Sequence, residues 1–166
     1  MEGGAMNVVE FSGVRLRYGS SKSFEALVSA LYDAVGSEPA PVGEIAVRSS
    51  DWDAFERSVG RYVGPYGFML FTEFDHGAWI DKAGIDRQVL RVVIGNPLIA
   101  ITMLRHDVTA GLFAPVELLL TSEASGSALT YVLPSSLMVV SDNPALLEAA
   151  TALDEKLAAL AEAVTG

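Results

Sequence analysis

Apolar residues recur every three or four positions in three long stretches of the chain, which is the spacing of an amphipathic helix. The stretches cover residues 23–35, 52–63 and 144–164, and each combines an apolar stripe with polar or charged positions. Gly36 and Gly64-Pro65 follow the first two stretches and are typical helix ends. Two shorter helices are predicted at residues 78–83 and after Asn96-Pro97, where a capping residue precedes a proline.

Other stretches show the alternation or the short apolar runs typical of strands. We predict strands at residues 7–18, 44–48, 67–74, 89–94, 112–120 and 128–133, with 139–140 as a further short strand. A turn at residues 123–127 joins two of these strands into a hairpin. The connection between the strands at 67–74 and 89–94 contains a predicted helix, so we expect a crossover and parallel pairing. This order predicts an α+β domain with one mixed sheet covered by helices on one face.

Composition limits the domain count and the partners. The chain has 166 residues, which favours one domain over 1–166, and its 51% hydrophobic content excludes intrinsic disorder. The formal net charge of −10 leaves no basic stripe for a phosphate backbone, so we expect no nucleic-acid binding. Cysteine is absent, which excludes disulfides and cysteine-ligated metal sites. No signal peptide or membrane-spanning run is recognisable, so we expect a cytoplasmic protein without membrane contact.

Several short motifs resemble those of one known family. Residues 67–77 (GFMLFTEFDHG), 95–100 (GNPLIA) and 111–115 (GLFAP) are similar, in order and spacing, to motifs of the domain of unknown function 302. The similarity covers most of residues 50–166, whereas the N-terminal part, residues 7–49, includes at 20–49 a helix and a strand beyond the usual strand–helix opening of the family. The resemblance implies a TATA-binding-protein-like α+β fold, ordered strand, helix, four strands, helix, and a homodimer. It implies no established activity, cofactor or catalytic residue, and fold alone does not establish function.

Asp75-His76 and Gly95-Asn96 follow the two strands that we expect to be parallel. Parallel strands end at the same edge of a sheet, where α/β proteins place ligands, so we expect one pocket there. His76 could act as a general base with Asp75 orienting it, and the helix beginning at Asn96 would present free N–H groups to an anion. The alternative is that Asp75 and Asn96 only cap helices and that His76 is exposed beside them.

Met103, Arg105 and His106 lie near the end of the helix that Asn96 begins. Arg105 and His106 fit the helix dipole at this end, and the alternative is a metal or haem site using His106 and Met103. Two histidines without cysteine make a poor metal site, so we predict none. Eight aromatic and methionine residues are expected in the core or around a small-molecule cavity: Phe68, Met69, Phe71, Trp79, Met103, Phe113, Tyr131 and Met138.

Three functional hypotheses follow. The first is a homodimeric small-molecule-binding domain whose pocket is formed by seven residues: Asp75, His76, Trp79, Gly95, Asn96, Met103 and His106. The second is an enzyme that uses His76 and Asp75 as an acid–base pair on a small carbonyl or carboxylate substrate. The third is a structural or partner-docking subunit whose apolar surface forms the dimer face. The sequence identifies neither a cofactor nor a ligand.

Overall fold

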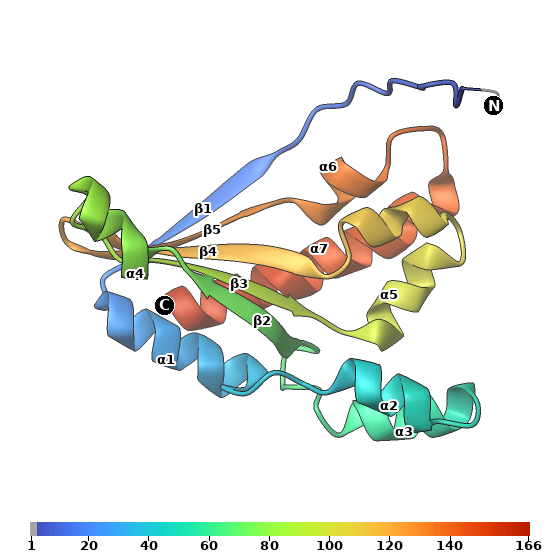
Figure 1. Cartoon of the computed structure of the whole chain (residues 1–166), viewed down its shortest axis with the longest axis horizontal. Coiled ribbons are helices and arrows are strands. Elements are labelled where there is room, and N and C mark those ends of the chain that lie inside the picture. Colours follow the sequence, from blue (N-terminus) through green and yellow to red (C-terminus); the bar gives the residue numbers. More distant parts are fainter. Residues whose placement is uncertain (1–2) are drawn as a thin grey trace.

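Five strands form one antiparallel sheet. The computed structural model describes residues 3–166, and within them every pair of neighbouring strands is antiparallel, in the order β1-β5-β4-β3-β2 (Figure 1). The strands are β1 (Arg15–Ser20), β2 (Met69–Asp75), β3 (Val89–Gly95), β4 (Val116–Glu123) and β5 (Gly126–Val132). The α+β class is confirmed, whereas the predicted mixed sheet is wrong.

The pairing of β2 with β3 contradicts the predicted parallel crossover. Between them lie only α4 (Gly77–Ile80) and the 3-10 helix η1 (Asp81–Ala83). Asp75, the last residue of β2, pairs with Leu90 near the start of β3, so the chain leaves and re-enters the sheet at the same end. The two short helices therefore form an excursion at one end of the sheet, and β3 returns beside β2 in the opposite direction.

The predicted helices are present, and residues 3–166 contain three further short ones. The remaining helices of residues 3–166 are α1 (Phe24–Val35), α2 (Val42–Arg48), α3 (Trp52–Gly60), α5 (Pro97–Leu104), the 3-10 helix η2 (Val108–Leu112), α6 (Pro134–Met138) and α7 (Pro144–Thr165). The three that were not predicted are α2, η2 and α6. Gly36 ends α1 with a φ of 93°, a conformation that favours glycine. No helix in this part of the chain is both long and apolar enough to cross a membrane.

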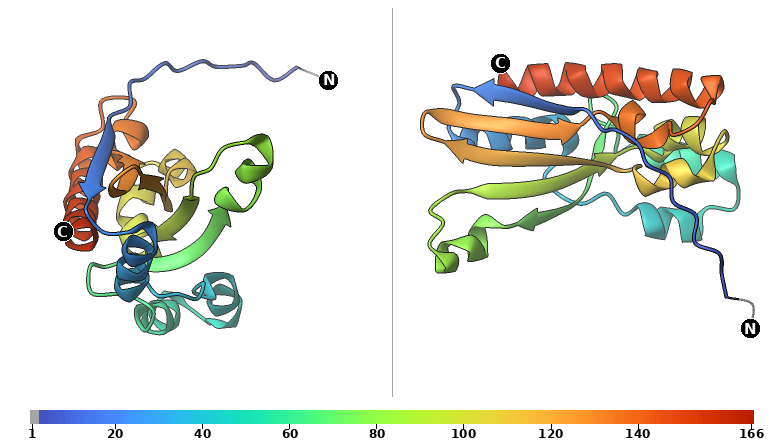
Figure 2. Two further views of the ribbon diagram at one scale, coloured as in Figure 1. Left: turned by 90° about the vertical axis from the view of Figure 1, so that its left-hand side faces the viewer. Right: turned by 90° about the horizontal axis from the view of Figure 1, so that it is seen from above.

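Helices α1 and α7 cover one face of the sheet (Figure 2). Leu27 and Leu31 of α1 and Leu157 of α7 are fully buried in one cluster with Val92 of β3 and Leu118 of β4. Burying each such side chain contributes about 1.5–3 kcal/mol. Alternate residues of the strands and every third or fourth residue of the two helices pack together in this cluster. The predicted covering of one face by helices is therefore confirmed.

The opposite face of the sheet, called the open face, is lined by paired charges. Arg17 of β1 and Arg87 each place a guanidinium nitrogen 3.2 Å from Glu123 Oε1 of β4. Arg91 of β3 pairs with Glu117 of β4 through Nε and Oε2 at 2.9 Å. In the view from above in Figure 2, α7 lies along one edge of the molecule, to one side of the strands. Such partly exposed ion pairs each contribute about 0–1 kcal/mol to the free energy of unfolding. They allow this face of the sheet to contact solvent and add little to stability.

Two predicted strands near the start of the chain are wrong. Of residues 7–18 only the end belongs to β1, since β5 ends at Val132 opposite Arg15 and offers no partner beyond it. Residues 3–14 continue as an extended arm (Figure 1). Residues 44–48 lie in α2, a helix without buried residues. Asp51 caps α3, accepting a hydrogen bond from Ala54 N at 2.8 Å.

The end of the sheet is largely as predicted. β4 and β5 form the expected hairpin, with Glu123 opposite Gly126. β4 begins at Val116 instead of residue 112 because residues 108–112 form η2. The expected strand at 139–140 is absent: Val139 caps the end of α6, and residues 139–140 are assigned to no strand.

Candidate functional site

The two turns predicted to share a pocket lie at opposite ends of the sheet. Asp75, the last residue of β2, pairs with Leu90 near the start of β3, whereas Gly95 at the end of β3 pairs with Met69. Figure 1 shows α4, which follows Asp75, and α5, which follows Gly95, at opposite ends of the molecule. The predicted common pocket is therefore wrong, because antiparallel strands end at opposite edges.

At the first end, the Asp75 side chain caps the start of α4. Its Oδ1 accepts a hydrogen bond from Ala78 N at 3.2 Å, so the carboxylate stabilises the first turn of α4. The His76 ring packs edge-on against Trp79, with centroids 6.0 Å apart, and Trp79 is 58% exposed. Within residues 3–166 no hydrogen bond joins the Asp75 and His76 side chains. This end shows helix capping and a half-buried histidine packed against an exposed tryptophan instead of an oriented acid–base dyad.

At the second end, Asn96 uses both atoms of its amide. Asn96 Oδ1 accepts from Leu98 N at 2.9 Å and caps α5, while Nδ2 donates to the Gly67 carbonyl at 2.9 Å. The residue is 9% exposed, and Pro97 occupies the first helical turn. The side chain thus fixes the β3–α5 junction to the loop before β2, and each polar atom of its amide already has one partner within the chain.

An apolar pocket, called the α5 pocket, lies beside this junction and has a volume of about 180 Å³. Its walls come from the chain before β2, from β2, α5, the chain before β4 and α7, and they include Phe68, Phe71, Ile99, Met103, Pro115 and Leu153. Gly95 is part of the wall, and a Cβ added there would lie 2.9 Å from Phe71 Cε2 and 3.1 Å from Pro115 Cβ. Glycine at position 95 therefore allows these two side chains to approach the strand.

The α5 pocket contains some of the predicted site residues and excludes others. Gly95, Asn96 and Met103 line it, as do Phe68 and Phe71 from the aromatic and methionine set. Sequence reasoning missed Ile99, Pro115 and Leu153, which come from three separate segments. Only the GNPLIA and GLFAP motifs, which contain two of these residues, marked their neighbourhood.

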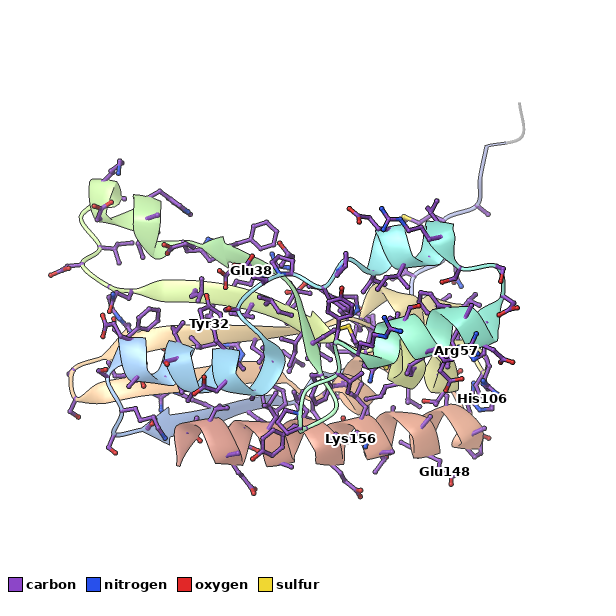
Figure 3. All side chains as sticks on the ribbon, turned by 90° about the horizontal axis from the view of Figure 1, so that it is seen from below. Tyr32, Glu38, Arg57, His106, Glu148 and Lys156 are labelled. Carbon is purple, nitrogen blue, oxygen red and sulfur yellow. The ribbon has the colours of Figure 1, made fainter. Side chains whose placement is uncertain are left out.

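His106 does not belong to the pocket. It is exposed beyond the end of α5, and its carbonyl accepts a hydrogen bond from Asn143 Nδ2 at 3.3 Å. Figure 3 shows His106 at the end of the molecule opposite the green helix α4, so it shares no site with His76. Met103, by contrast, is 1% exposed. In the described part of the chain no group of three His, Cys, Asp or Glu residues could hold a metal ion.

Tyr32, whose pKa is raised, joins α1 to β2 outside the pocket. Tyr32 donates its hydroxyl proton to Glu73 Oε2 at 2.6 Å, and Figure 3 shows Tyr32 on α1, far from His106. Burial, and then this hydrogen bond, raises the pKa of Tyr32 to about 12. None of the side chains lining the α5 pocket is titratable. The pocket is therefore suited to binding and contains no group for acid–base chemistry.

Comparison with known proteins identifies a family and a similar fold. The family model described as "Domain of unknown function DUF302" matches residues 45–164. A crystal structure of an uncharacterized conserved DUF302 protein from Bacillus stearothermophilus is similar to this chain, with a TM-score of 0.64 and 17% sequence identity. The alignment covers 90% of this chain and 97% of that one. At this identity the likeness shows the fold alone. The search of curated proteins found no match.

Proposed function

The chain belongs to the family of the domain of unknown function DUF302, and we propose that its role is to bind a small apolar molecule in the α5 pocket. The observation that carries the proposal is the pocket itself, about 180 Å³ of apolar space at the start of α5. An engineered apolar cavity of about 150 Å³ in another protein binds benzene or xenon, so the volume is sufficient for a small ring.

The chemistry of the walls selects an uncharged ligand. The lining residues carry no charge, and both amide atoms of Asn96 are already hydrogen-bonded within the chain. An ionic ligand would lose its hydration without gaining a partner, which is costly. Binding therefore relies on burial of apolar surface, about 25 cal/mol per Å² removed from water.

Toluene is the probe that tests this proposal. Ala100 is half-buried on α5 and lines the pocket, so Ala100→Leu adds three carbon atoms to the cavity while keeping a good helix former. The matched control is Ala159→Leu, an exposed position on α7. Ligand-observed NMR titration is expected to show saturable binding to the wild type and to the control, and at least tenfold weaker binding to Ala100→Leu. Absent binding to the wild type, or equal binding to all three proteins, would refute the proposal.

We also propose that the protein is a homodimer. Support comes from large apolar residues exposed at one end of the molecule: Val108 and Leu112 of η2 are 78% and 79% exposed, and Val8 of the arm is 68% exposed. Light scattering at micromolar concentration is expected to give twice the mass of the chain, and a monomer would contradict the proposal.

The name TATA-binding-protein-like is a proposal of the same kind. It is supported by the order of the main elements, because β1 and α1 precede the four strands β2 to β5 and α7 follows them. Helices α2, α3, α5 and α6 then count as additions between the strands and helices of this basic order. An experimental structure in which β1 paired with a strand other than β5 would contradict the assignment.

A further inference from the structure

A second hollow with mostly apolar walls shares part of its lining with the α5 pocket. This hollow, called the α6 pocket, has a volume of about 330 Å³ and is lined by Phe113, Val132, Pro134 and Leu137 among other residues. Pro115 and Val116 line both pockets. The two hollows therefore border the same two residues at the start of β4.

We propose that the two pockets form one elongated site, whose ligand lies across Pro115 with an apolar end in the α5 pocket and its other end in the α6 pocket. The inference rests on the proposed function and names the class of its ligand. Together the pockets provide on the order of 500 Å³, within the range of about 300–1,000 Å³ typical of small-molecule sites. The α5 pocket alone falls below that range.

Glu117 indicates which polar group the ligand carries at the end that lies in the α6 pocket. Among the residues that line the two pockets in the described part of the chain, Glu117 is the only charged one. Its Oε2 accepts a hydrogen bond from Arg91 Nε at 2.9 Å, and its side chain is 57% exposed. Carboxylate oxygens accept several hydrogen bonds, so Glu117 can also accept one from a ligand hydroxyl. A ligand carboxylate would instead face a like charge. The site therefore favours an elongated apolar alcohol.

Primary alcohols of increasing length test the inference. Each methylene that enters apolar space is expected to increase affinity about fourfold. In an elongated site the gain continues from 1-butanol through 1-hexanol to 1-octanol, measured by titration calorimetry with the full chain. We expect octanoate to bind at least tenfold more weakly than 1-octanol, and Glu117→Gln to reduce this difference.

Variants that fill the α6 pocket distinguish its contribution to binding from that of the α5 pocket. Val132→Phe and, as a second variant, Leu137→Trp fill the α6 pocket, and each is expected to remove the gain beyond 1-hexanol while leaving 1-butanol binding unchanged. Val89→Phe is the matched control, since Val89 is half-buried on the open face and lines neither pocket.

The outcomes distinguish the two proposals. If toluene and 1-butanol both fail to bind, the proposed function is wrong, and this inference is wrong with it. If they bind but affinity stops rising beyond 1-hexanol, or if both α6-pocket variants follow the wild-type series, the α5 pocket acts alone. Either of these last results overturns the elongated site and leaves the proposed function standing.

Discussion

Asn96→Ala is expected to cost about twice as much stability as loss of an ordinary helix cap. The cap to Leu98 N contributes about 1 kcal/mol. The second hydrogen bond, from Nδ2 to the Gly67 carbonyl, leaves a half-buried acceptor without its partner when it is removed, which costs about 1 kcal/mol more. The expected loss is therefore about 2 kcal/mol, which corresponds to a decrease in Tm of roughly 4–8 °C for a chain of this size.

The chain provides a matched control in Asn143. This residue also precedes a proline and caps a helix, since its Oδ1 accepts from Leu146 N at 3.1 Å. Its Nδ2 reaches only the carbonyl of the exposed His106, which water can satisfy instead. Asn143→Ala should thus lose about 1 kcal/mol, the cap alone.

Urea unfolding followed by circular dichroism measures both variants. The midpoint is expected to fall for each of them, with an unchanged m-value, and Asn96→Ala should fall about twice as far as Asn143→Ala. Equal losses would refute the reasoning, because they would show that the contact with Gly67 contributes nothing and that Asn96 is only a cap.

Three further predictions concern other parts of the molecule. Because the folded pKa of Tyr32 is raised to about 12 from an ordinary value of 10.0, its contribution to stability is fully present below pH 10 and is lost as the pH rises toward 12. Tyr32→Phe should reduce that loss without abolishing it, because burial also raises the pKa of Tyr131, and a variant that loses as much stability as the wild type over this range would contradict the prediction. His76→Ala should leave toluene binding unchanged, since His76 lies at the other end of the sheet, and should change stability by less than about 0.5 kcal/mol in urea unfolding; weakened toluene binding would place His76 in the site. A chain of net charge −10 should show no gel shift with duplex DNA at physiological salt, and a salt-sensitive shift at micromolar protein would overturn this expectation.

The spacing of hydrophobic residues correctly predicted the two long helices of this chain. α1 and α7 have apolar stripes that face the sheet, and their burial produced the periodicity in the sequence. α2 has no buried residue, so its sequence shows no apolar stripe of helical spacing. The alternation of Ile45 and Val47 with polar or small residues instead favoured a strand. The direction of β3 relative to β2 depends on tertiary structure, and the spacing of hydrophobic residues along the chain does not determine it.

The candidate site was only partly accessible from sequence for a related reason. The Gly95-Asn96-Pro97 signal identified the correct junction, because capping is a local property of the chain. The pocket beside it depends on Phe71, Pro115 and Leu153, which are brought together only by the sheet and α7. Asp75 and His76 have the same kind of turn signal, but antiparallel pairing puts them at the far end. A motif therefore locates a helix start more reliably than it locates a binding site.

The strand order has a consequence for how the chain folds. Strands β2 to β5 are neighbours both in the sequence and in the sheet, so they can pair progressively after short loop closures. β1 pairs instead with β5, near the other end of the chain, and must wait until that strand is in place. Until β1 docks, β5 is an unpaired edge that can recruit a strand from another molecule. Refolding at high protein concentration should therefore be most vulnerable to aggregation in the interval before β1 closes the sheet.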